Sequence, residues 1–190
     1  MVAAGYMAKR VRMRPDWLAA AHVADIYSVS GCISGPFADY VNDWRHNGYW
    51  FFDSPAIIEQ QLARDHAIDL AATTLFFYEV HDQEFDEDER RWVPIAREGF
   101  PTSVVPPSEK TLEGYDVVSF SVGTTPECSP LSCNGLAREI ETNAYCLLAS
   151  FERARQLLND GAFTGSEPGP FRIFAVYSVP WTANPQISAA

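Results

Sequence analysis

Two cysteines in a polar loop have the residue type and spacing most suggestive of chemistry in this chain. Cys128 and Cys133 lie in residues 123–135 (GTTPECSPLSCNG), with four residues between them. A cysteine attacks as its thiolate, which forms near neutral pH beside a cation or a helix N-terminus. We expect a short helix over residues 136–140 to follow Cys133 and to lower its pKa. A cysteine-dependent enzyme would then recruit a histidine from elsewhere in the chain.

The same loop also fits roles without catalysis. A zinc knuckle needs a second pair of ligands, and neither Cys32 nor Cys146 stands in a matching pair. A disulfide between Cys128 and Cys133 fits a turn but is disfavoured where thiols stay reduced. We favour a compact turn in which the cysteines fill small apolar gaps. The sequence therefore predicts no metal site and no cofactor.

Glu79 and His81 form a second candidate catalytic pair. They stand two residues apart in residues 73–81 (TTLFFYEVH), which predict a strand from their aromatic and β-branched side chains. Residues two apart on a strand share a face, and a carboxylate beside an imidazole is a usable acid/base pair. If the protein is an enzyme, Cys128, Cys133, His81 and Glu79 are the predicted catalytic residues. The alternative is that the pair is simply the solvated end of a strand.

Residues 82–89 (DQEFDEDE) hold six acids in eight positions. They lack the glycine of a calcium-binding loop, so they predict no calcium site. We expect a solvated hairpin tip that docks a basic partner, with clustered charge raising the association rate and an aromatic side chain as anchor. The predicted partner-binding residues are Asp82, Glu84, Phe85, Asp86, Glu87, Asp88 and Glu89.

The charge of the chain is unevenly distributed. Its 190 residues carry 14 bases and 25 acids, a net charge of −11. Residues 1–15 contain Lys9, Arg10, Arg12 and Arg14 and no acid, so the remainder has 10 bases against 25 acids and a net charge of −15. The acidic body argues against nucleic acid as a partner, except through the basic arm. We interpret residues 1–15 as this arm or as a first strand, because apolar and basic residues alternate within it.

Composition and pattern indicate a single compact α+β domain. A hydrophobic content of 47% excludes a disordered chain, and no apolar run approaches the ~18 residues of a membrane span. The beginning of the chain has no apolar segment typical of a secretory signal, so we expect a cytoplasmic protein. Residues 16–180 are expected to form the domain and residues 181–190 a C-terminal tail. The sheet should be mostly antiparallel or mixed, with about three helices packed on one face.

Residues that favour helix ends mark where several of the expected helices begin and end. Three helices are predicted: one over residues 37–46, one after Ser54 and Pro55, and one between Ser150 and Gly161. Further strands are predicted over residues 25–30, 91–96, 115–122 and 171–179, with Pro94 placing its strand at a sheet edge. The aromatic residues 49–52 are expected to lie mainly in the core.

Two functions of different classes follow. The first is an acidic interaction module that binds and blocks a basic protein, as an immunity protein or a nucleic-acid-mimicking inhibitor does. The second is a cysteine-dependent enzyme that uses Cys128 or Cys133 with a distant histidine. The acidic cluster and the absence of a complete catalytic motif favour the first, so the sequence favours a function without catalysis.

Overall fold

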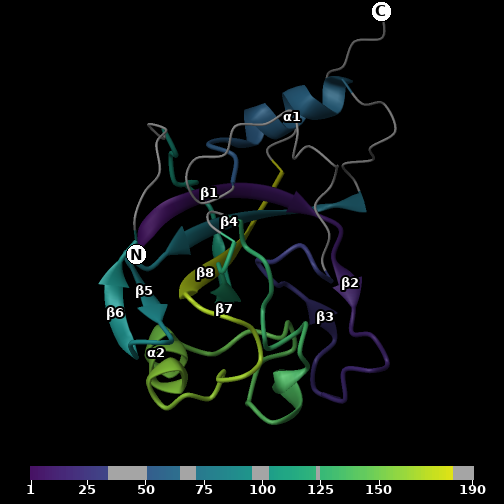
Figure 1. Ribbon diagram of the computed structural model, residues 1–190. Helices are drawn as coiled ribbons and strands as arrows, with labels where there is room; N and C mark the ends of the chain where they lie inside the picture. Colours follow the sequence, from purple (N-terminus) through teal and green to yellow (C-terminus); the bar gives the residue numbers. More distant parts are fainter. Residues whose placement is uncertain (34–50, 65–71, 96–102, 123–124, 182–190) are drawn as a thin grey trace, which may run out of the picture.

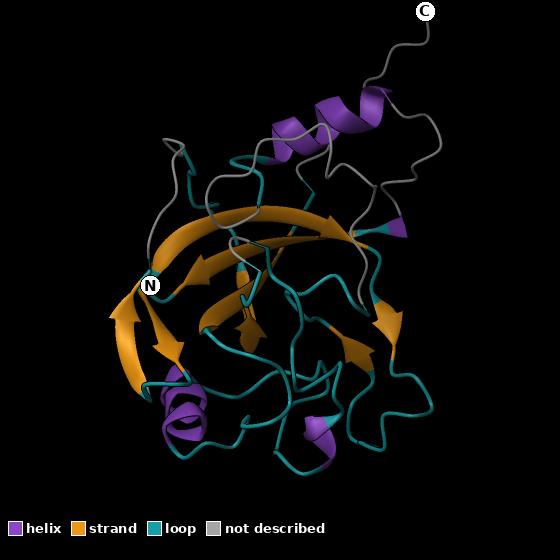
Figure 2. Cartoon of the chain, in the orientation of Figure 1, coloured by secondary structure: helices purple, strands orange, loops and turns teal. Residues whose placement is uncertain are grey.

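The computed structural model describes residues 1–33, 51–64, 72–95, 103–122 and 125–181. In this part of the chain a six-stranded antiparallel sheet carries the fold, beside a small two-stranded sheet (Figure 2). The large sheet contains β1 (Val2–Lys9), β4 (Thr74–Val80), β5 (Gln83–Asp86), β6 (Arg91–Pro94), β7 (Thr111–Ser119) and β8 (Phe171–Val179). The small sheet contains β2 (Arg12–Met13) and β3 (Asp25–Ile26).

The last strand, β8, is the centre of the large sheet. It pairs with β4 along one edge and with β7 along the other, and Phe171 pairs with Phe85 of β5 (Figure 1). The β5–β6 hairpin extends the sheet from there, with β6 at its edge. Alternate β8 residues enter different core clusters, Phe174 with one and Ile173 with the other. Both faces of β8 are therefore buried.

Two α-helices are present in the described ranges, fewer than the predicted number of about three. They are α1 (Pro55–Arg64) and α2 (Phe151–Asn159), and a short 3₁₀ turn covers Leu136–Arg138. The helices lie at opposite ends of the molecule rather than together on one face (Figure 1). Ile58 of α1 enters one core cluster, while Leu157 and Leu158 of α2 enter the other.

Several local predictions are confirmed. Ser150 caps α2 by accepting a hydrogen bond from the Arg153 amide, and Gly161 follows in a left-handed conformation with φ 77°. Strand β8 has the predicted bounds, and Pro94 lies in the edge strand β6. Phe51 and Phe52 are buried, as expected of the aromatic run. The predicted helix over residues 37–46 and the tail beyond residue 181 lie outside the described residues.

Other segments differ from the prediction. The acidic segment contains a strand, β5, rather than only a loop, because buried Phe85 alternates with the partly buried acids on either side of it and pairs with Trp92. The basic arm forms two strands instead of one: the long β1 over Val2–Lys9, and the short β2 over Arg12–Met13 in the stretch where alternation predicted a strand. In the described ranges no helix has the length and apolarity needed to cross a lipid bilayer.

Candidate functional site

Three cysteines from distant parts of the chain meet beside the sheet. The sulfur atoms of Cys32, Cys128 and Cys133 all lie within 4.8 Å of one another, and those of Cys32 and Cys128 are 3.9 Å apart. Cys32 is exposed, Cys133 is partly buried and Cys128 is buried. The cluster is therefore reachable from solvent on the side of Cys32, while its other two thiols are held within the protein.

A buried lysine fixes the segment that leads to Cys32. Lys9 ends β1 and is only 1% exposed, and its ammonium donates hydrogen bonds to three successive carbonyls. The acceptors are the carbonyl oxygens of Ser28, Val29 and Ser30, at 2.5, 3.2 and 2.5 Å. Burial lowers the pKa of Lys9 to about 7, although the nearby Asp116 and cysteines oppose this shift.

A buried aspartate joins this segment to the other cysteines. Asp116, in the middle of β7, accepts hydrogen bonds from the Val29 amide at 2.8 Å and from the Ser28 hydroxyl at 3.2 Å. Its second oxygen accepts one from the Ser129 hydroxyl at 2.6 Å, next to Cys128. Burial raises the pKa of Asp116 to about 6, and these hydrogen bonds oppose the rise. The carboxylate thus holds both cysteine-bearing segments against one strand.

The three thiols differ in the direction in which their surroundings shift the pKa. Hydrogen bonding with Cys128, and then with Cys133, lowers the pKa of Cys32. The hydrogen bonds to Cys133 and Cys32, together with burial, raise the pKa of Cys128. For Cys133, the hydrogen bond with Cys128 lowers the pKa, but that with Cys32 and burial outweigh it and the net change is a rise. Cys32 is therefore the thiol that ionises most readily.

The expected activation of Cys133 by a helix is wrong. The helix that follows is a 3₁₀ turn of three residues, and its N-cap is Gly135. One turn has almost no dipole to offer a thiolate. The neighbours of Cys133 are instead the hydroxyls of Ser30 at 3.6 Å and Ser132 at 3.9 Å.

His81 and Glu79 do not accompany the cysteines. The ring of His81 packs against those of Phe151 and Trp92, at centroid distances of 4.8 and 5.5 Å, and its Nδ1 lies 3.2 Å from Asp82. Glu79 pairs with Lys110 at 2.6 Å and accepts a hydrogen bond from Tyr177 at 2.8 Å. No hydrogen bond or ion pair between described residues joins either side chain to a cysteine. The geometry does not assemble the predicted cysteine–histidine site.

The acidic segment borders a hollow of about 280 Å³. Glu84, Asp86, Glu87 and Asp88 line it, together with Val93 and residues 168–170. Asp88 is exposed, and its carboxylate has no hydrogen bond or ion pair with the rest of the described chain. Phe85 is only 3% exposed and belongs to the core. It cannot be the exposed anchor that the sequence predicted, although the acids around it do face the hollow.

Part of the acidity is used within the protein. Glu84 lies 2.8 Å from Arg172, and both side chains are largely buried. Glu87 accepts a hydrogen bond from the Gly169 amide, and Glu89 pairs with Arg91. The free charge of the hollow therefore comes mainly from Asp86 and Asp88.

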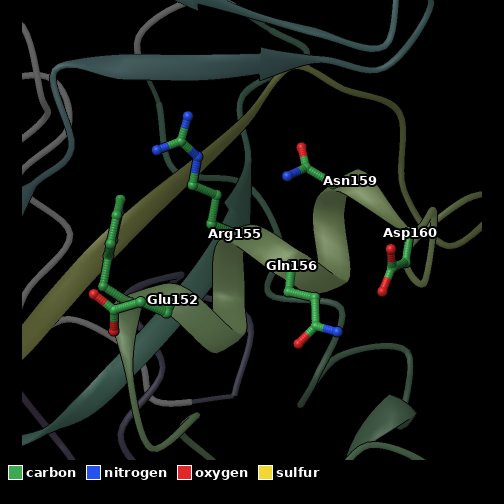
Figure 3. A pocket seen from close by; sticks show the side chains of 6 residues that line it. Glu152, Arg155, Gln156, Asn159 and Asp160 are labelled. Carbon is green, nitrogen blue, oxygen red and sulfur yellow. The ribbon is translucent and has the colours of Figure 1, made fainter.

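A shallow groove of about 350 Å³ follows the outer side of α2. Its lining comes entirely from this helix and its C-cap: Phe151, Glu152, Arg155, Gln156, Asn159 and Asp160. The side chains of Arg155 and Asn159 point to one side of the helix and that of Gln156 to the other (Figure 3). Asn159 already accepts hydrogen bonds from Arg90 and Trp92. The groove has no converging set of groups that could bind a ligand or act on one.

Lys9, Asp116 and Cys32 are the residues that the sequence patterns missed. Lys9 reads as part of a basic arm, and Asp116 as an outward polar position of a strand. Cys32 stands alone in a glycine-flanked turn, 96 residues before Cys128. The sequence offered one sign of this cluster: it has four cysteines, so two remain that could join the pair at 128 and 133.

Comparisons of the chain with protein-family models, with curated proteins and with solved structures found no match.

Proposed function

We propose that the protein is an acidic interaction module that binds and blocks a basic protein in the cytoplasm. The observation that carries this proposal is the hollow beside the β5–β6 hairpin, with four carboxylates on its wall. A lysine or arginine side chain of a partner suits a hollow of about 280 Å³ with this charge. The protein would then act on its partner as an immunity protein or a nucleic-acid-mimicking inhibitor does.

Two carboxylates on the hollow are free to serve a partner. Asp88 has no bond to the described part of the protein, and Asp86 accepts only the backbone amide of Glu89. Glu84 and Glu87 are held by Arg172 and Gly169 and would shape the hollow. The acidic body of net charge −15 would add long-range attraction and raise the association rate.

A labelled oligo-arginine peptide is a suitable first probe. We expect amide chemical-shift changes in β5, β6 and residues 168–170, and we expect them to disappear as salt is raised past the ~0.15 M at which the Debye length is about 8 Å. Asp86→Asn with Asp88→Asn should weaken peptide binding about tenfold. Glu141→Gln with Glu139→Gln, which removes two exposed acids elsewhere, should leave it within twofold. Shift changes spread evenly over the acidic surface would contradict a located docking site.

The partner itself can be sought with the same pair of variants. A basic protein retained from host extract by the wild type and by the Glu139/Glu141 variant, and lost by the Asp86/Asp88 variant, supports the proposal. Retention that is equal for all three proteins and insensitive to salt would count against charge-guided docking.

A second candidate, the cysteine-dependent enzyme, is favoured by one observation. Cys32 is exposed, and its hydrogen bonds with the neighbouring thiols lower its pKa, so it would be the nucleophile in place of Cys128 or Cys133. Rapid alkylation of Cys32 by iodoacetamide below pH 7 supports this candidate. Alkylation that follows an ordinary thiol pKa of about 8.5 would exclude it.

A further inference from the structure

We propose that Cys32, Cys128 and Cys133 form a three-thiolate site for Zn²⁺, with the fourth position open to an exchangeable ligand. This inference is independent of the docking surface and goes beyond it. It concerns three side chains that two distant segments bring within 4.8 Å of one another.

The sulfur positions fit the ion. Zinc–sulfur bonds of about 2.3 Å place the sulfur atoms of a tetrahedral site roughly 3.8 Å apart. Cys32 and Cys128 are 3.9 Å apart, and the third sulfur lies within 4.8 Å of both. Cys133 therefore needs to move by less than about 1 Å to complete the site. Three sulfur atoms select thiophilic ions over Mg²⁺ and Ca²⁺, which prefer oxygen.

The surroundings keep the two segments in place without a metal. Lys9 holds the carbonyls of residues 28–30 on one side, and Asp116 holds Val29 and Ser129 on the other. Metal ligands in proteins are usually oriented by such an outer set of hydrogen bonds. The network explains why an exposed cysteine and a buried cysteine are already in contact.

Charge and protons balance in a simple way. Each S–H bond breaks as a Zn–S bond forms, and the three protons pass to the buffer, with no electron transferred. Three thiolates and one divalent ion leave a net charge of −1, which the nearby Lys9 ammonium would offset. Because Cys32 is exposed, water can reach the site and would fill the fourth position. Two protein oxygens lie beside the cluster: the Glu127 carbonyl oxygen, 3.0 Å from the Cys32 sulfur, and the Asn134 side-chain oxygen, 3.8 Å from the Cys128 sulfur.

Cobalt is the probe of choice, because thiolate-bound Co²⁺ absorbs strongly. The reduced, metal-free full-length chain is titrated with Co²⁺ and then with Zn²⁺. We expect one Co²⁺ per chain, a thiolate-to-cobalt charge-transfer band of three-sulfur intensity, and its loss when Zn²⁺ displaces Co²⁺. Zn²⁺ should also protect three of the four thiols from a thiol-reactive dye.

Single substitutions identify the ligands. Cys32→Ser, Cys128→Ser and Cys133→Ser should each weaken Zn²⁺ binding by at least about a hundredfold, the upper end of the loss seen for outer-shell partners. Cys146→Ala removes the remaining thiol, which is buried outside the cluster, and should bind Zn²⁺ like the wild type. Cys32 is exposed, so its substitution leaves the core intact and remains informative if Cys128→Ser does not fold.

Three results would overturn the proposal. One is the absence of a charge-transfer band in the reduced protein. Another is binding that survives Cys32→Ser or is lost in Cys146→Ala. The third is a stable Cys32–Cys128 disulfide that forms in air and is not prevented by Zn²⁺, which would make the cluster a redox pair.

Discussion

Lys9 and Asp116 hold the same short segment from opposite sides through opposite kinds of hydrogen bond. Lys9 donates to the carbonyls of residues 28–30, while Asp116 accepts from the amide of Val29 and the hydroxyl of Ser28. Both side chains are buried, and the segment lies between their charges in place of a direct salt bridge. A buried cation and a buried anion compensate each other here through the backbone that they fix.

This relationship predicts coupled stability effects. Lys9→Met should reduce the free energy of unfolding by about 3–5 kcal/mol, because it leaves carbonyls unsatisfied and Asp116 without a nearby cation. Asp116→Asn should also be destabilising. The double variant should lose less than the sum of the two by about 1–3 kcal/mol in urea unfolding. Strict additivity would show that the two residues act separately.

Two ion pairs on the acidic hairpin should differ sharply in their contribution. Glu84→Gln leaves Arg172, whose side chain is only 6% exposed, without its carboxylate, and should cost about 3 kcal/mol. Glu89→Gln breaks an exposed pair with Arg91 and should change stability by less than about 1 kcal/mol. Thermal unfolding of the two variants at one pH measures the difference. Equal losses would contradict the burial of the Glu84–Arg172 pair.

His81 should make stability depend on pH below about 6.5. Burial lowers its pKa below the usual 6.5, with Asp82 opposing the shift, so the unfolded chain takes up a proton that the folded chain refuses. Stability from this group is present above pH 6.5 and is lost as the pH falls. His81→Phe keeps a ring against Phe151 and Trp92 and should flatten this part of the profile. Asp116 titrates in a similar pH range, because burial raises its pKa to about 6. It is present in both proteins, so its contribution to the pH dependence cancels when the two are compared.

Gly114 should tolerate no side chain. It lies at a β-bulge with φ 149°, and an added Cβ would stand 2.7 Å from the Leu147 Cβ and 2.9 Å from the Leu148 carbonyl oxygen. Gly114→Ala combines backbone strain with overpacking and should cost about 3 kcal/mol. Gly165→Ala, at φ 78° with no atom within 4 Å of the new Cβ, isolates the backbone effect and should cost about 1 kcal/mol. Equal losses would argue against the close approach at Gly114.

The sequence predicted those helices and strands that are specified by residues close together in the chain. Strands β4 and β8 are rich in aromatic and β-branched residues, and α2 has both a serine cap and a glycine stop. The strand β5 was missed because its acids resemble a loop, although Phe85 between Glu84 and Asp86 gives the alternation of a strand. The number and placement of the helices depend on packing between distant segments, which periodicity does not encode.

The cysteine site also depends on contacts between distant segments, which the sequence pattern did not predict. The pair at 128 and 133 was visible, but Cys32 joins it only through the folded path of residues 28–33 across β7. Lys9 stands close to three arginines in the sequence, a pattern typical of a solvent-exposed lysine. No neighbouring residue indicates that the carbonyls of residues 28–30 will surround it. Burial of a charge depends on tertiary partners, so sequence pattern alone could not place it.

The position of β8 has a consequence for how the protein is made. It is the last strand in the described part of the chain, and β4, β5 and β7 all pair with it. During synthesis β1 and β4 emerge first as a two-stranded ribbon, which is only marginally stable in water. The edge of β4 that pairs with β8 stays unpaired until residue 179 has left the ribosome. A nascent chain that stalls before Phe171 would thus be a client for chaperones and proteases rather than a smaller working protein.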